Sequence, residues 1–271
     1  MRLMRISIVI LFVLTSIAFA GVYVHQKRTL DNTLPEITLD TDFIEVSCDA
    51  TNADFLKGVT ATDKKDGDLT SEVVVESVSR FIEPGVCEIK YAVCDSNNHV
   101  ARATRKVRYK DYEAPKFTLD SSLCFSLYET INISSLIGAV DSIDGDISEN
   151  IVITSPDYTS AVTGIFTLEL SVSNKKGDTS TLSIPLIMED RPLSAPVIEL
   201  EEYLVYVDKN QKFNFESNIV SATDRNEKDL TDQVVIDDNV DFSKSGTYTV
   251  HYFVTDSNEA EGHSVLTVVV E

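Results

Sequence analysis

Residues 61–75 read ATDKKDGDLTSEVVV, a charged run around one glycine that gives way abruptly to β-branched apolar residues. The same pattern returns as AVDSIDGDISENIVI at residues 139–153 and, without the glycine, as SATDRNEKDLTDQVVI at residues 221–236. A catalytic site is seldom written three times in one chain. The pattern therefore predicts a repeated architectural module with an acidic turn in each copy.

Three units of about eighty residues can be laid over one another around these turns. Each opens with a proline and a short strand, at Pro35, Pro115 and Pro196, and each ends in a long hairpin, at residues 84–109, 163–188 and 245–270. We call the units repeat 1 (residues 35–110), repeat 2 (115–189) and repeat 3 (196–271). Residues 1–28 precede them as a targeting segment, and residues 29–34 form a linker.

The hairpin of repeat 3 shows the period of a β-strand. Tyr248, Val250, Tyr252 and Val254 alternate with polar or outward residues, DSNEAEG makes the turn, and HSVLTVVV returns. Cys87 and Phe166 take the place of Tyr248 in the other two repeats. Short strands with frequent turn signals predict an all-β chain with one antiparallel β-sandwich per repeat.

The N-terminus predicts contact with a membrane. MRLMR is followed by ISIVILFVLTSIAFAGVYV, 19 residues without a charge, and then by HQKR. At 1.5 Å per residue this run spans a hydrocarbon core of about 30 Å, so a retained single-pass anchor through residues 6–24 is favoured. The alternative is a signal peptide cleaved after Ala20, which leaves Gly21 as the first residue of a secreted chain. Both place the repeats outside the cytoplasm.

The amino-acid composition limits the classes of partner that the chain can bind. The 271 residues are 43% hydrophobic, enough for real cores, and 44 acidic against 23 basic residues give a formal charge of −21. This charge repels phosphate backbones and excludes a nucleic-acid partner.

The four cysteines leave two alternatives. Cys48, Cys87, Cys94 and Cys124 match no zinc-binding spacing, and an exported chain is compatible either with disulfides, in three possible pairings, or with buried thiols. Strand alternation in CEIKYAVC places Cys87 on the core face and Cys94 on the other face.

The sequences of repeats 1 and 3 resemble the bacterial immunoglobulin-like repeats first noticed in a pesticidal crystal protein. Those repeats are similar to A-x-D-x-x-D-G-D-L-T followed by P-G-T-Y-T-V-x-Y-x-V-x-D, and the resemblance extends over residues 35–271. Repeat 2 departs at Ser173 and Asn174, and repeat 3 lacks the glycine of the acidic turn. The resemblance implies three tandem immunoglobulin-like sandwiches on a bacterial surface, acting as spacers or adhesion modules, with no catalytic residues.

The acidic turns are the one set of residues with chemical promise. Carboxylates are ligands for calcium, and the candidates are Asp63, Asp66 and Asp68 in repeat 1 and Asp141, Asp144 and Asp146 in repeat 2. The alternative is a structural turn, in which Asp accepts backbone N–H bonds while Gly67 and Gly145 take positive φ. Lys228, in place of the glycine in repeat 3, favours the structural turn, and we predict no metal site.

No catalytic or cofactor-binding residue is predicted. The acidic turns are expected to be well solvated, which argues against a raised carboxyl pKa for acid–base work, and His99, His251 and His263 lie in hairpins of different repeats or on opposite hairpin limbs. No phosphate loop, dinucleotide motif or nucleophile elbow occurs in the sequence. The basic stretch ARATRKVRY (residues 101–109) is interpreted as a solvated edge strand.

Together these features predict a monomeric, non-catalytic rod of three sandwiches tethered to a bacterial membrane, with an extracellular protein or glycan as its partner. The alternative is a secreted carbohydrate-binding or accessory module of a polysaccharide enzyme system. The short linkers KDYEAP (110–115) and EDRPLSAP (189–196) end in proline, so neighbouring repeats are expected end to end rather than folded back.

Overall fold

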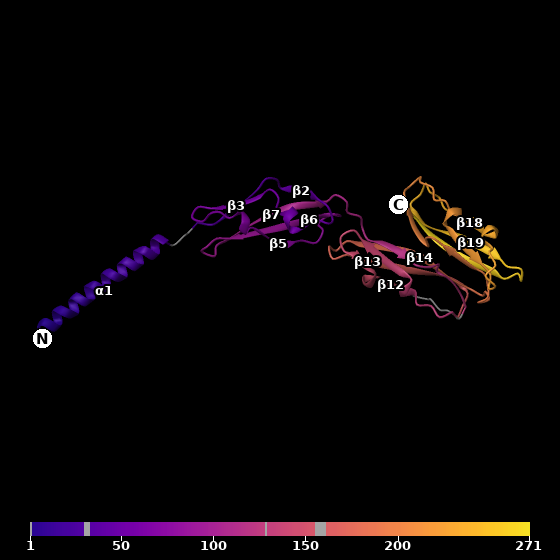
Figure 1. The fold of residues 1–271 in the computed structure, drawn as a ribbon, viewed down its shortest axis with the longest axis horizontal. Helices are drawn as coiled ribbons and strands as arrows, with labels where there is room; N and C mark the ends of the chain where they lie inside the picture. Colours follow the sequence, from indigo (N-terminus) through magenta and orange to yellow (C-terminus); the bar gives the residue numbers. More distant parts are fainter. Residues whose placement is uncertain (1, 30–32, 128, 155–160) are drawn as a thin grey trace. The chain divides into compact units, whose positions relative to one another are not determined.

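The computed structural model describes residues 2–29, 33–127, 129–154 and 161–271 (Figure 1). Residues 30–32 of the predicted linker 29–34 lie outside the described residues. The chain divides into two compact units, residues 1–110 and 111–271, and each is described by itself.

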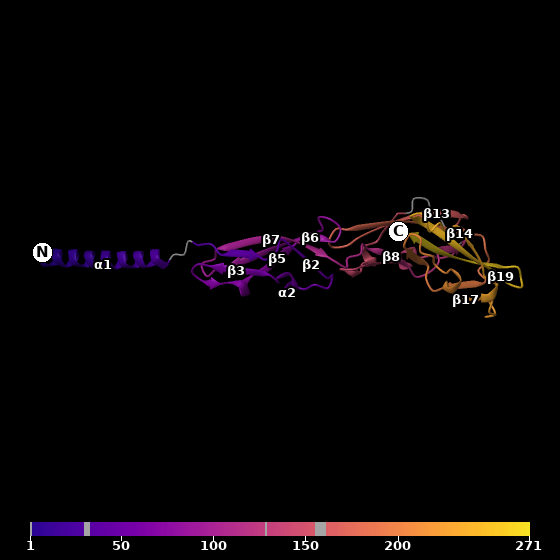
Figure 2. The same cartoon turned by 90° about the horizontal axis from the view of Figure 1, so that it is seen from above.

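A single long helix, α1 (Arg2–Thr29), forms the N-terminal element (Figure 2). Its segment Ile6–His25 is 20 residues long and apolar enough to cross a membrane. The apolar side chains of this segment are exposed, including Phe12 and Phe19. An all-β chain preceded by an apolar helix confirms the predicted fold class.

Repeat 1 forms two sheets. The first has the strand order β1-β3-β4 and the second the order β2-β7-β6-β5. The elements are β1 (Glu36–Leu39), β2 (Phe43–Val46), α2 (Asn52–Phe55), β3 (Val59–Asp63), β4 (Gly67–Asp68), β5 (Val74–Val78), β6 (Val86–Cys94) and β7 (Val100–Tyr109). All pairings are antiparallel except β2 with β7, which is parallel.

Repeats 2 and 3 reproduce this pattern. In repeat 2 the sheets have the orders β11-β10-β8 and β12-β13-β14-β9, and in repeat 3 the orders are β15-β17 and β16-β20-β19-β18. The strands of repeat 2 are β8 (Lys116–Leu119), β9 (Cys124–Ser126), β10 (Ile137–Asp141), β11 (Gly145–Asp146), β12 (Val152–Thr154), β13 (Gly164–Ser173) and β14 (Thr179–Glu189). Those of repeat 3 are β15 (Val197–Leu200), β16 (Leu204–Val207), β17 (Ile219–Thr223), β18 (Val235–Asp238), β19 (Gly246–Thr255) and β20 (Glu261–Val270).

The central hairpins follow the predicted alternation. On β6, Cys87, Ile89, Tyr91 and Val93 are buried, while Cys94 is exposed. Val250, Tyr252 and Val254 of β19 are buried in the same way. Because alternate residues of a strand face one side of the sheet, this periodicity was sufficient to identify the core.

The interpretation of residues 101–109 as a solvated edge strand is wrong. β7 is an interior strand that pairs with β2 on one side and β6 on the other. Arg105, on this strand, is 2% exposed. Its guanidinium donates to the Tyr91 hydroxyl at 2.8 Å and to the carbonyls of Phe55 and Lys57, so the buried charge is hydrogen-bonded on several sides.

The four cysteines, all within the described residues, form no disulfide. Cys87 and Cys124 are buried, Cys48 is half-buried and Cys94 is exposed. Of the two alternatives that the sequence left open, the structure has thiols.

The expectation that neighbouring repeats lie end to end is wrong for repeats 2 and 3. Near the end of β20, Val269 packs against the core of repeat 2, and on the adjacent β16 the Tyr206 hydroxyl accepts the backbone N–H of Phe117 at 3.0 Å. In the middle of β20, Val265 donates its backbone N–H to the Ser122 hydroxyl at 2.8 Å. Contacts from the middle to the end of one strand place repeat 3 alongside repeat 2, because burying both apolar faces outweighs the stiffness of the linker.

Candidate functional site

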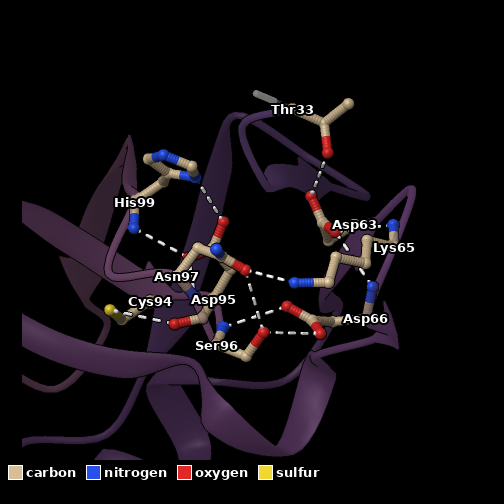
Figure 3. Close-up of polar contacts among 9 residues, drawn as sticks. All are labelled: Thr33, Asp63, Lys65, Asp66, Cys94, Asp95, Ser96, Asn97 and His99. Carbon is tan, nitrogen blue, oxygen red and sulfur yellow. Dashed lines mark hydrogen bonds and ion pairs between the residues drawn. The ribbon is translucent and has the colours of Figure 1, made fainter. Parts of the chain in front are cut away.

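The acidic turn of repeat 1 is built around a buried aspartate. Asp63 ends β3 and is 6% exposed. Its Oδ1 accepts the backbone N–H groups of Lys65 at 2.7 Å and Asp66 at 3.0 Å (Figure 3). The hydrogen bond from Asp66 holds the pKa of the Asp63 carboxyl below its usual value, against the opposing effect of burial. Gly67 completes the turn with φ +78°.

A second loop lies against this turn. Ser96, in the turn between β6 and β7, donates its backbone N–H and its hydroxyl to the Asp66 carboxylate at 2.9 and 2.8 Å (Figure 3). The Lys65 ammonium donates to the side-chain oxygen of Asn97. Two loops 30 residues apart are therefore joined through an aspartate of the acidic turn.

The second loop has its own buried aspartate. Asp95 accepts the backbone N–H groups of Asn97 at 2.8 Å and His99 at 2.7 Å, and its other oxygen lies 2.7 Å from the His99 ring Nδ1. Burial alone raises the pKa of Asp95, but the hydrogen bonds from His99 and Asn97 outweigh it and lower the pKa below its usual value. Each carboxylate thus replaces water with backbone donors.

Repeat 2 has the same pair of loops with one change. Asp141 is 2% exposed and accepts the N–H groups of Ile143 at 2.9 Å and Asp144 at 2.8 Å. Asn174 stands where repeat 1 has Asp95, and its amide donates to Asp141 at 2.9 Å. The Asp144 carboxylate accepts the N–H of Lys175 at 2.6 Å, as Asp66 accepts that of Ser96.

Repeat 3 keeps the aspartate and changes the turn. Asp224 is 8% exposed and accepts the N–H groups of Asn226 at 2.8 Å and Lys228 at 3.0 Å. The positive φ moves from the glycine position to the residue before it, Glu227, at +63°. This spacing matches the hairpin loop of the same repeat, where Asp256 accepts the N–H groups of Asn258 and Ala260 and Glu259 has φ +61°.

The candidate calcium ligands thus occupy three kinds of position. Asp63 and Asp141 are buried, so the expectation of well-solvated carboxylates is wrong for the first aspartate of each turn. Asp68 and Asp146 are exposed, and each accepts the backbone N–H two residues later, from Thr70 and Ser148, at 2.9 Å.

Asp66 and Asp144 bridge to the second loop. Carboxylate oxygens that already accept N–H bonds fit a structural turn better than an oxygen cage, which requires six to eight ligands. Independence from calcium stays a prediction.

A different group of side chains comes together away from these turns. Cys124, Glu189 and His263 place their sulfur, oxygen and nitrogen atoms within 4.8 Å of one another, and they form the sole such group of three or more potential metal ligands among the described residues. Sequence reasoning missed it because two of the residues belong to repeat 2 and one to repeat 3. The available signal was limited to the hairpin, whose expected turn places His251 and His263 on facing limbs.

The comparisons with known proteins agree with the sandwich architecture. Residues 205–270 match the family model described as "Bacterial surface protein, Ig-like domain". An uncharacterized 81.3 kDa protein of Acholeplasma phage L2 is 34% identical over 136 residues, which cover 49% of this chain and 18% of that protein. The pesticidal crystal protein Cry22Aa of Bacillus thuringiensis is 32% identical over 124 residues, which cover 44% of this chain and 16% of that protein. The chain therefore spans less than a fifth of either relative.

Among solved structures, one of CBM51-2 in complex with GlcNAc and INT domains from Clostridium perfringens ZmpB has a TM-score of 0.24 and 21% identity, over 55% of this chain and 26% of that one. The extracellular domain of protocadherin GammaB4 has a TM-score of 0.22 and 14% identity, over 89% of this chain and 50% of that one. At these scores neither likeness carries an inference about function. The resemblance to bacterial immunoglobulin-like repeats is confirmed for residues 205–270, which match the Ig-like domain of bacterial surface proteins.

Proposed function

We propose that this chain is a non-catalytic module of a bacterial cell surface, retained in the membrane by residues 6–24 and presenting its sandwiches outside the cell for adhesion or spacing. The observation that carries the proposal is the match of residues 205–270 to an Ig-like domain of bacterial surface proteins. The apolar segment Ile6–His25 supports the retained anchor, because its length suits a hydrocarbon core of about 30 Å.

The acidic turns support a role without catalysis. Asp63, Asp141 and Asp224 are each buried and hydrogen-bonded to the backbone of their own turns. The pKa of Asp63 and that of Asp224 lie below the usual value, so these carboxyls stay ionised at neutral pH, whereas a general acid requires a raised pKa. The turns shape the loops and leave the surface for contacts with a partner.

The experiment uses the exposed thiol of Cys94 as a reporter of location. Intact cells that express the full chain are treated with a membrane-impermeant maleimide, and the chain is then analysed by mass spectrometry. We expect Cys94 to be labelled on intact cells and the Cys94→Ser chain to lose most of the label, because the other three thiols are half-buried or buried. Labelling that requires cell lysis would refute the surface location.

The same samples test the anchor and the role. A chain recovered from the membrane fraction with its N-terminal segment intact supports retention, whereas a chain that begins at Gly21 shows cleavage. Detergent-solubilised full-length chain is then applied to cell-wall glycans. Adhesion to proteins or spacing predicts no saturable glycan binding, and saturable binding would instead establish a carbohydrate-binding module.

A further inference from the structure

Four side chains from repeats 2 and 3 meet where β20 passes β9. Cys124 is on β9, which pairs in parallel with the end of β14, and Glu189 is the last residue of β14. His263 is on β20 and His251 on the neighbouring β19. Repeats 2 and 3 thus contact each other through a thiol, a carboxylate and two imidazole side chains.

Two of the short distances in this group share one atom, the Nδ1 of His263. The His263 Nδ1 lies 2.7 Å from a carboxylate oxygen of Glu189 and 3.3 Å from the Cys124 sulfur. On the other side of the ring, the His263 Nε2 lies 2.9 Å from the His251 Nδ1. When His263 donates through Nε2 to His251, its Nδ1 carries a lone pair that faces the carboxylate and the sulfur. The nitrogen, the carboxylate oxygen and the sulfur then surround one point, which a cation can occupy once the thiol has lost its proton.

The surroundings keep these groups in place. Cys124 is 4% exposed and His263 is 7% exposed, and Cys124 packs with Ile187 and Val265 in a small apolar cluster. The Phe253 ring stacks on His263 with 4.3 Å between ring centroids. A side chain fixed by packing on one face and by a hydrogen bond on the far nitrogen is pre-oriented for a ligand at its near nitrogen.

The linker between the repeats fastens the backbone beside the same point. Arg191 donates to the carbonyl of His263 at 2.8 Å and to the carbonyl of Cys124 at 2.9 Å. One guanidinium therefore holds β9 of repeat 2 next to β20 of repeat 3. A cavity of about 270 Å³, lined by Cys124, His263 and Arg191 among others, opens beside the cluster and provides an entry path.

We propose that Cys124, Glu189 and His263 form a binding site for a divalent transition metal of the zinc type, which fastens repeat 3 to repeat 2. A set of one sulfur, one nitrogen and one oxygen donor suits Zn²⁺, whereas Ca²⁺ and Mg²⁺ prefer oxygen donors alone. Three protein ligands leave a fourth position for water or another donor. His251 acts as a positioning residue, because it contacts His263 rather than the proposed ion.

The competing explanation is a hydrogen-bond network with no ion. Burial raises the pKa of the Cys124 thiol to about 12, so without an ion the thiol stays protonated and the metal must displace that proton to bind. The two explanations differ in a direct readout, which is a bond between sulfur and metal.

The test titrates full-length, chelator-treated chain in detergent micelles with Co²⁺, which replaces Zn²⁺ and absorbs visible light. We expect a charge-transfer band from a thiolate bound to Co²⁺, loss of that band when Zn²⁺ is added, and a higher melting temperature with Zn²⁺. Cys124→Ser removes the band. Glu189→Gln keeps the shape of the side chain and lowers affinity by about tenfold or more, and His251→Gln lowers it by about 10- to 100-fold through the orientation of His263.

Matched controls come from repeat 1. Cys94→Ser and His99→Gln change a thiol and an imidazole of the same chain outside the cluster, and both variants should retain the band. Absence of the band in the unaltered chain, or a band that survives Cys124→Ser and disappears with Cys94→Ser, would overturn the proposal. Because Glu189→Gln is isosteric, unchanged affinity in a folded variant would overturn it as well.

Discussion

Repeats 1 and 3 solve the same packing problem with different residues at one buried position. The pairing of Ile89 with Arg105 in repeat 1 corresponds to that of Val250 with Leu266 in repeat 3. Leu266 is 0% exposed and Arg105 is 2% exposed. A cation and an aliphatic side chain thus occupy equivalent positions in two sandwiches, so the fold requires that the space be filled rather than that it be apolar.

The surrounding carbonyls explain why the cation is tolerated. In both repeats a core tyrosine donates its hydroxyl to a loop carbonyl: Tyr91 to Phe55 at 2.8 Å and Tyr252 to Phe215 at 3.1 Å. In repeat 1, Arg105 adds donors to the same carbonyl and to that of Lys57, and it pairs with Asp40 at 3.4 Å. In repeat 1 the guanidinium of Arg105 and the hydroxyl of Tyr91 therefore both bind the α2 loop to the sheet, whereas in repeat 3 the hydroxyl of Tyr252 binds the corresponding loop.

Exchanging these two residues should give the largest effect. Leu266→Arg buries a charge with no arranged acceptors, and we expect the free energy of unfolding to fall by more than about 3 kcal/mol. Arg105→Leu reproduces the residue of repeat 3, and we expect a change within about 2 kcal/mol, because the Tyr91 hydroxyl still serves the Phe55 carbonyl and an apolar replacement avoids the cost of burying a charge. Denaturant unfolding of both variants measures the asymmetry, and equal losses would contradict it.

Arg105 also shows which part of the structure could not be predicted from the sequence. Alternation identified the core face of β6 and β19, because every residue there is apolar. The same rule failed on β7, where charges at alternate positions predicted an edge strand, because the acceptors for Arg105 come from a loop some fifty residues away. The acidic turns were recognised as turns for their local pattern. The contact between Cys124 and His263 depends on how two repeats pack, which no local pattern encodes.

The acidic turns are the second point of comparison, and their buried aspartates should matter in both repeats. Asp63→Ala leaves the N–H groups of Lys65 and Asp66 without an acceptor, and Asp224→Ala does the same to Asn226 and Lys228. We expect each change to lower the melting temperature by about 10 °C, because these part-buried turns lose the acceptor of two backbone N–H groups. Calorimetry in excess chelator checks this against Asp68→Ala, an exposed control expected to lose much less. A fall confined to calcium-containing buffer would indicate an ion site instead.

Low pH should lower the stability of repeats 1 and 3, because it protonates the same buried aspartates. The pKa values of Asp63 and Asp95 in repeat 1, and of Asp224 and Asp256 in repeat 3, are held low mainly by backbone N–H donors that outweigh burial. A carboxyl with a lower pKa in the folded state binds fewer protons there than in the unfolded chain. Its contribution is therefore fully present above about pH 4 and is lost as the pH falls through the lowered folded value.

Repeat 2 already contains the variant that sharpens this prediction, since Asn174 stands where repeat 1 has Asp95. Asp95→Asn keeps an oxygen to accept the N–H groups of Asn97 and His99 while removing the titrating group. We expect the melting temperature of this variant to lie below that of the unaltered chain at pH 7, because the contribution of the ionised carboxylate is lost, and to fall less steeply between about pH 4 and pH 2, so that the two chains converge in acid. Parallel acid limbs would show that Asp95 titrates alike in both states.

The smallest expected effects come from adding or removing glycine in the acidic turns, and the change in stability should have opposite signs in repeats 1 and 3. Gly67 has φ +78° and no neighbour within 4 Å of an added Cβ, so Gly67→Ala meets backbone strain alone and should destabilise repeat 1 by about 1 kcal/mol. In repeat 3 the positive φ, +63°, is carried by Glu227, which is exposed and already bears that strain. Glu227→Gly should therefore stabilise the turn, by less than about 1 kcal/mol, because relief of strain is only partly offset by the greater freedom of glycine in the unfolded chain.

Lys228→Gly, at the position that aligns with Gly67, gains no such relief and should be neutral or slightly destabilising. Chemical denaturation of the three variants measures these differences. If Lys228→Gly stabilised the chain and Glu227→Gly did not, the turn of repeat 3 would take its positive φ at the same position as that of repeat 1, and the proposed shift by one residue would be wrong.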